Sequence, residues 1–107
     1  MLVLEARKAG SKGSINKNGH YQTGEIHALE VHVKDTARFS GTANWAFFMA
    51  NDRVTGKLLP KEMECYSCHE QHGAVDTTFV QFYPTLLEIA KKKNTLSAGY
   101  VKEEAAK

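Results

Sequence analysis

Residues 65–69 read Cys65-Tyr66-Ser67-Cys68-His69, and they contain both cysteines of this 107-residue chain. A C-x-x-C-H stretch is the attachment signature of a c-type haem. The two thiols form thioether bonds to one side of the porphyrin, and the histidine that follows the second thiol donates an imidazole nitrogen to the iron. The motif therefore predicts one haem c bound covalently at Cys65 and Cys68, with His69 as the metal ligand.

Three other interpretations of the cysteine pair remain open. A thioredoxin-like redox pair follows a strand and opens a helix, but residues 58–64 lack the pattern of a buried strand. A zinc site formed with His69 and His72 would crowd four ligands into a very tight loop. A disulfide across two residues would close a small, strained ring. The histidine directly after the second cysteine favours haem.

The composition is that of an ordinary globular chain. Hydrophobic residues make up 42% and charged residues 24%, which excludes a collagen-like chain and a charge-driven disordered one. The length predicts one domain over residues 1–107. No apolar run approaches the roughly 20 residues of a membrane helix. The net charge of +2 is too small to indicate nucleic-acid binding.

The N-terminal half predicts three strands. Apolar and polar residues alternate over residues 2–7 and 25–34, the pattern of a half-buried strand. Residues 45–50 are all apolar and predict a third strand with Trp45, Phe47 and Met49 on one face. Residues 9–18 are rich in Gly, Ser, Lys and Asn, which predicts a loop or hairpin connection between the first two strands.

After the cysteines the apolar spacing becomes helical. Asp76 or Thr77 is expected to cap a first helix, and Pro84 to open a second one over residues 85–92. The polar tail, residues 101–107, is expected to fray. The first of these helices is inferred from apolar residues three or four positions apart: Val75, Phe79, Phe82 and Tyr83. Strands followed by helices predict an α+β fold that is mainly β.

Several stretches together resemble the cytochrome P-460 / cytochrome c′-beta family, over about residues 2–90. The resemblance implies an antiparallel sheet followed by C-terminal helices that pack around one covalent haem c. It also implies export to the periplasm and a homodimer. The stretches that carry it are Gly24-Glu25-Ile26, Leu29-Glu30-Val31-His32-Val33-Lys34-Asp35, Arg38-Phe39, Trp45-Ala46-Phe47-Phe48, the C-x-x-C-H motif, Asp76, Phe79 and Gln81-Phe82-Tyr83-Pro84.

The resemblance also assigns site residues. Glu25 matches a carboxylate on the distal side of the haem and is the expected catalytic base. Phe47 and Phe48 match an aromatic segment that contributes to cofactor binding. The remaining positions are the attachment thiols and the proximal ligand: Cys65, Cys68 and His69.

One departure from the family concerns a lysine that P-460 cytochromes cross-link to the porphyrin. Its position falls at Leu4, which cannot form the bond, and Lys8 points away unless the strand is shifted. With a lysine-modified haem, the expected activity is hydroxylamine oxidation. With an ordinary haem c, the chain resembles the c′-beta branch, which binds NO and CO. Family members also carry an N-terminal segment and usually a signal peptide, so we expect a mature or truncated form.

The expected function is that of a periplasmic mono-haem cytochrome that binds or oxidises small nitrogen species, hydroxylamine or NO, at an open distal site. An electron-accepting cytochrome is the expected macromolecular partner. The alternative is a six-coordinate electron-transfer cytochrome c, whose second axial ligand would be a methionine or a histidine. The candidates for that ligand are Met49, Met63, His20, His27, His32 and His72.

Overall fold

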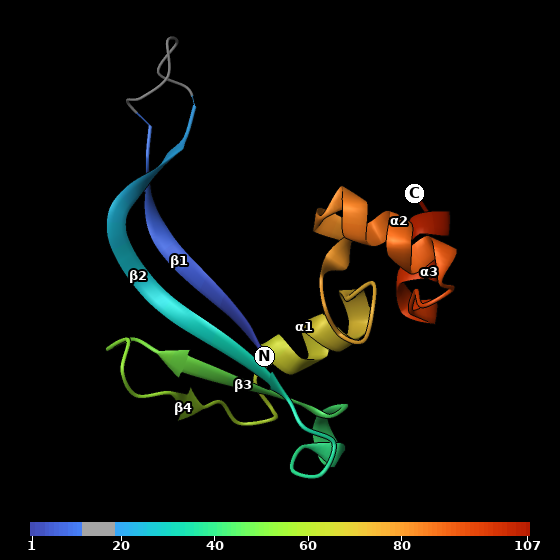
Figure 1. Ribbon diagram of the computed structural model, residues 1–107, viewed down its shortest axis with the longest axis horizontal. Coiled ribbons are helices and arrows are strands. Elements are labelled where there is room, and N and C mark those ends of the chain that lie inside the picture. The colour runs from blue at the N-terminus through green and yellow to red at the C-terminus, as the bar shows by residue number, and fades with distance from the viewer. Residues whose placement is uncertain (12–18) are drawn as a thin grey trace. The chain divides into compact units, whose positions relative to one another are not determined.

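The computed structural model describes residues 1–11 and 19–107. Two compact units make up the chain, a sheet unit (Met1–Pro60) and a helical unit (Lys61–Lys107) (Figure 1). The predicted fold class, α+β with an antiparallel sheet followed by C-terminal helices, is confirmed. One domain over residues 1–107 stays a prediction. Within the described residues, no helix has the length and apolar character needed to cross a membrane.

The sheet unit is a four-stranded antiparallel sheet in the order β1-β2-β3-β4. All three predicted strands are present, and the first two are longer than expected. Of the predicted loop over residues 9–18, Ala9 and Gly10 belong to β1 and residues 12–18 lie outside the described residues. The strands are β1 (Leu2–Gly10), β2 (Tyr21–Lys34), β3 (Trp45–Ala50) and β4 (Lys57–Leu58), with a 3-10 turn, η1 (Ser40–Thr42), before β3.

The pairing of β1 with β2 is irregular near its middle. Ala6 lies opposite Ala28, but Arg7 lies opposite Ile26 and Ala9 opposite Gln22, so the register shifts on both sides of Arg7. Such irregularities change which face of the sheet the following side chains occupy. Lys8 lies within this shifted part of the strand, which simple alternation along the sequence does not reveal.

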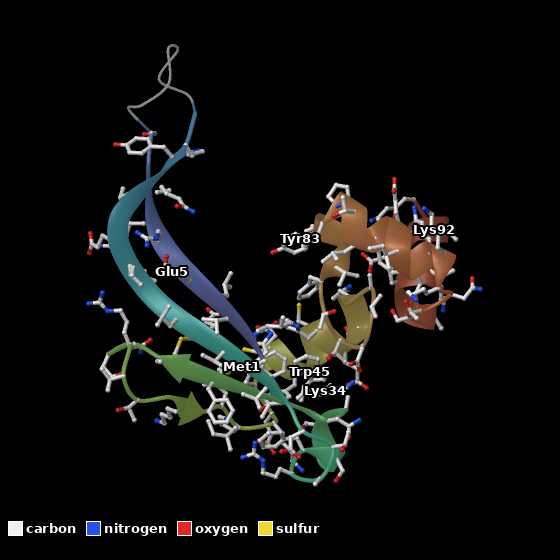
Figure 2. All side chains as sticks on the ribbon, in the orientation of Figure 1. Met1, Glu5, Lys34, Trp45, Tyr83 and Lys92 are labelled. Carbon is white, nitrogen blue, oxygen red and sulfur yellow. The ribbon has the colours of Figure 1, made fainter. Side chains whose placement is uncertain are left out.

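The core of the sheet unit centres on β3. Trp45, Ala46 and Phe47 are exposed by only 7, 1 and 4%. Consecutive buried residues mean that both faces of this strand are covered, because successive side chains point to opposite faces. The indole of Trp45 lies beside the ammonium group of Lys34, 5.9 Å from the ring centroid (Figure 2).

The helical unit holds α1 (Glu64–His72), a 3-10 turn η2 (Val80–Phe82), α2 (Pro84–Lys92) and α3 (Ala98–Ala105). The second predicted helix is confirmed as α2, with Pro84 in its first turn. A proline is well placed there, because the N–H that it lacks would have no partner within the helix.

The helix predicted from Val75, Phe79, Phe82 and Tyr83 is wrong. Val75 and Thr78 instead form an antiparallel bridge. The two residues between them, Asp76 and Thr77, have φ of 47° and 59°, so they form a tight turn and cap no helix. The apolar residues of this segment have helical spacing, but they lie in or directly beside the turn over residues 75–78 and η2, so the spacing here does not reflect a helix.

The frayed tail predicted over residues 101–107 is also wrong over most of its length, since α3 extends to Ala105. Ser97 caps this helix, and its Oγ accepts a hydrogen bond from the backbone N–H of Tyr100 at 3.3 Å. The side chain of Tyr100 is buried, which gives an otherwise polar helix an anchor.

Two side chains hold the backbone directly after α1. Ser97 Oγ donates to the carbonyl of Gly73 at 2.7 Å, and the Ser97 N–H donates to the carbonyl of Ala74 at 2.8 Å. Gln81 Nε2 donates to the carbonyl of His72 at 2.7 Å, while its Oε1 accepts from the Ala74 N–H at 3.1 Å. Ala74 is fully buried. These contacts fix the C-terminal end of α1.

We expect Ser97→Ala to lower the free energy of unfolding by about 1–2 kcal/mol, because it removes a helix cap and a hydrogen bond to a buried carbonyl. Urea denaturation of the full chain measures the change. Ser40→Ala, at an exposed position in η1, is the matched control and should shift stability by less than about 0.5 kcal/mol. Equal midpoints for the two variants would contradict the role given to Ser97.

Candidate functional site

α1 carries the cysteine pair and the histidine that follows it. Cys65 and Cys68 are three positions apart, so their side chains lie on one side of the helix. Both are free thiols, Cys65 half-buried and Cys68 exposed. Glu64 stands in the first turn, where a negative charge is favourable at the positive end of the helix dipole. The helix therefore presents two thiols on one side, with His69 next in the chain.

The imidazole of His69 is held in one tautomer. Its Nδ1 lies 2.9 Å from the backbone carbonyl oxygen of Thr77. A carbonyl only accepts hydrogen bonds, so Nδ1 carries the proton and Nε2 has the lone pair that binds a metal. The ring of Phe79 packs edge-on against the imidazole, with centroids 4.4 Å apart. Both contacts restrict rotation of the histidine ring.

The alternative uses of the cysteine pair find no support in this geometry. His72 turns toward α3, where its Nδ1 lies 3.0 Å from Oε2 of Glu103, and this hydrogen bond lowers the pKa of the Glu103 carboxyl. Throughout residues 1–11 and 19–107, no three His, Cys, Asp or Glu side chains gather closely enough to hold a metal ion. The Cys2His2 zinc arrangement is therefore not assembled.

The strand that precedes α1 also departs from a thioredoxin-like arrangement. β4 is only two residues long, Lys57–Leu58, and both are exposed. A redox pair of that type follows a buried strand of a βαβ unit.

Glu25 lies on β2 and is largely exposed, with 63% of its side chain accessible. Its Oε1 is 2.6 Å from Nζ of Lys8 on β1. Leu4, also on β1, is half exposed. The lysine nearest in sequence to the family's cross-linking position is thus engaged with a carboxylate of the neighbouring strand.

Phe47 and Phe48 are adjacent in β3, so they occupy opposite faces of the sheet. Phe47 is buried, and its ring lies edge-on to His32 with centroids 4.3 Å apart. His32, a candidate second axial ligand, is half-buried beside this ring. Phe48 is half-buried and faces Phe39 at 6.5 Å. The two candidate aromatic residues therefore have different surroundings.

Two of the candidates for a second axial ligand belong to the helical unit. Met63 directly precedes α1 and lies two residues before Cys65. His72 lies three residues, or about 4.5 Å of helix, after His69 on the same helix. A haem held by Cys65, Cys68 and His69 would therefore have both side chains close to its histidine ligand in the chain, which does not favour either as the second ligand. The other candidates belong to the sheet unit: Met49, His20, His27 and His32.

The family model described as Cytochrome P460 matches residues 1–80, three quarters of the chain. The match takes in the four strands, α1 and the turn over residues 75–78. The chain belongs to the cytochrome P460 family. Comparison with the curated proteins finds no match. Membership of the cytochrome P460 family indicates a c-type cytochrome, and hence a haem-iron protein.

The residues on α1 fit the cofactor of the P460 family. Two free thiols lie on one side of the helix, and the histidine that follows them has Nε2 in the form that coordinates iron. Neither Thr77 nor Gly73 was singled out as functional from the sequence. Gly73 stands where helices commonly end in glycine, but nothing in the sequence points to the carbonyl of Thr77.

Phe47 is buried and Phe48 is half-buried, so the two candidate aromatic residues should differ in their contribution to stability. We expect Phe47→Ala to lower the free energy of unfolding by about 3–5 kcal/mol, because Phe47 is a core residue of the sheet unit. Phe48→Ala, at the half-buried neighbouring position, is the matched control and should cost clearly less. Chemical denaturation measures both. A larger loss of unfolding free energy for Phe48→Ala than for Phe47→Ala would contradict the assignment of Phe47 as the core residue of the pair.

Proposed function

We propose that this member of the cytochrome P460 family carries one haem c, bound by thioether bonds to Cys65 and Cys68 and ligated by Nε2 of His69. The observation that carries the proposal is the hydrogen bond from His69 Nδ1 to the Thr77 carbonyl, which leaves Nε2 as the coordinating nitrogen. Each thioether forms when an S–H adds across a vinyl group, so attachment consumes no oxidant.

We further propose that the protein binds or oxidises small nitrogen species, hydroxylamine or NO, at an open distal site. When bound, the haem supplies a redox-active iron with a coordination position for a small ligand. The helical unit supports an open site, because its two candidate ligands are close to the motif in the chain: Met63 directly precedes α1, and His72 lies on α1 itself. The ring of His32, another candidate ligand, packs against Phe47, and this contact supports a structural role for His32 in the sheet unit.

Glu25 is the residue we propose as the base in hydroxylamine oxidation, which requires a proton acceptor. The family resemblance at Gly24-Glu25-Ile26 supports this assignment. In the structure the carboxylate of Glu25 is exposed and pairs with Nζ of Lys8 on β1 at 2.6 Å. This pairing suits a purely structural role in joining β1 to β2. The two roles predict different kinetics for a glutamine variant.

Family membership also supports the cellular setting that we propose: export to the periplasm, an electron-accepting cytochrome as partner, and a homodimer. The outer position of β1 in the sheet fits self-association, because its first residues, Leu2, Val3 and Leu4, are exposed and apolar.

Expression in a host that matures c-type haem should yield a protein whose mass includes one haem after denaturation. The ferrous Soret band separates the two proposed behaviours: a band displaced far to the red indicates the lysine-modified haem and supports hydroxylamine oxidation, whereas the band of an ordinary haem c supports NO binding alone. We expect a Cys65→Ala/Cys68→Ala double variant to lose covalent haem, because both thioether bonds are removed. Mass spectrometry and the visible spectrum measure these outcomes.

His72→Ala provides the control for His69→Ala, since both histidines lie on α1 one turn apart. His72→Ala should keep the parent spectrum, whereas His69→Ala should change the coordination of the iron. CO binding on reduction would support the open distal site. A low-spin ferric spectrum without CO binding would instead support the six-coordinate electron-transfer cytochrome, and absence of haem would refute the proposal.

We expect Glu25→Gln to slow hydroxylamine oxidation by roughly a hundredfold, because the amide cannot accept the proton. Steady-state assays with an external electron acceptor measure the rate, and NO affinity should be unchanged. Glu5→Gln is the matched control, since Glu5 forms a comparable exposed ion pair with Arg7 on β1. If Glu25→Gln turns over hydroxylamine as fast as the parent, Glu25 is not the base, and its pairing with Lys8 is structural.

A further inference from the structure

The turn that contacts His69 has an unfavourable backbone conformation. Asp76 and Thr77 are consecutive residues in the left-handed region, with φ of 47° and 59°. A β-branched residue such as Thr77 rarely adopts this region, because its Cβ substituents crowd the backbone. The Oγ1 of Thr77 is buried and finds no hydrogen-bond partner within the described part of the chain. Strain retained at one residue commonly marks a functional constraint.

The turn is closed by its own hydrogen bonds. The Thr78 N–H donates to the Val75 carbonyl at 2.8 Å, and Oγ1 of Thr78 donates to the same oxygen at 2.6 Å. The Val75 N–H donates to the Thr78 carbonyl at 3.3 Å. These bonds leave the carbonyl of Thr77 directed at His69 Nδ1, eight residues earlier in the chain.

The close approach of this turn to α1 depends on Gly73. A Cβ at position 73 would lie 2.6 Å from the His69 carbonyl oxygen, 2.7 Å from the Thr77 carbonyl carbon and 2.9 Å from the Thr77 Cα. All three are backbone atoms, so no side chain can rotate to relieve the contact. The φ of Gly73 is −67°, which any residue can adopt, so the requirement for glycine there is one of space.

We propose that Gly73 and Thr77 are positioning residues for the iron ligand His69, an inference that rests on the proposed attachment of haem c to α1. Gly73 admits the strained turn, and the turn places the Thr77 carbonyl against Nδ1. The hydrogen bond fixes the tautomer and the ring orientation, and it makes the imidazole a stronger electron donor to iron. A stronger donor favours the ferric state and lowers the reduction potential.

Two substitutions of the holoprotein break the contact by different routes. Gly73→Ala forces the turn away from α1. Thr77→Pro forbids the turn, because proline is confined to φ near about −65°. For both we expect the iron–histidine stretching band of the ferrous protein to move to lower frequency in resonance Raman spectra, and the midpoint potential to rise.

Thr77→Gly is the conservative control, because glycine keeps the carbonyl and adopts positive φ easily. Gly41→Ala controls for the glycine substitution, since a Cβ there meets no described atom within 4 Å. Both should keep the parent band and potential.

Parent values for holoprotein carrying Gly73→Ala or Thr77→Pro would overturn the inference, as would a shift for Thr77→Gly as large as that for Thr77→Pro. If Gly73→Ala yields no folded holoprotein, the two Thr77 variants decide. Failure of the proposed function is recorded separately, because a parent chain without covalent haem is detected by its mass before any spectrum is compared.

Discussion

The hydrogen bond between His69 and the carbonyl of Thr77 joins α1 to the turn over residues 75–78 and constrains the histidine on which the proposed site depends. A histidine on an exposed helix can rotate and exchange tautomers, so it makes a poorly defined metal ligand until its second nitrogen is engaged. Here the engaging group is a backbone oxygen, and its place depends on the absence of a Cβ at Gly73. Gln81 and Ser97 then hold the backbone that follows α1.

Much of the fold could be predicted because it is encoded locally. The strand over residues 45–50 is entirely apolar, with Trp45, Phe47 and Met49 on one face, and α2 begins at a proline suited to a first helical turn. The turn over residues 75–78 could not be predicted, because Asp76 and Thr77 lack the glycine that usually marks positive φ. α3 was missed because its polar sequence resembles a frayed end. Its stability comes from the Ser97 cap and the burial of one side chain, Tyr100.

The candidate site likewise contains residues that a local motif predicts and a contact that only the folded chain reveals. The cysteines and His69 lie within five residues of one another, so a short motif is enough to predict them, and the family match separately indicates a c-type cytochrome. The hydrogen-bond partner of His69 is a main-chain carbonyl. Every residue has one, so the sequence does not indicate which residue provides it. The roles predicted for Glu25 and Phe47 rest on family resemblance. The structure adds an ion pair with Lys8 for Glu25 and a buried position for Phe47.

The distribution of apolar residues in the helical unit supports a structural role for the haem c that we propose. The buried side chains of the helical unit are few and mostly small, namely Ala74, Ala90 and Tyr100. Phe82 and Tyr83 are exposed by 73 and 60%, and Tyr83 projects from the start of α2 (Figure 2). A unit well below about 70–80 residues rarely gains enough stability from its own side chains and commonly depends on a disulfide or a metal group. Both cysteines here are free thiols, so a disulfide does not serve that purpose. A haem c tethered to α1 would, since one large planar group adds apolar area that the chain itself does not supply.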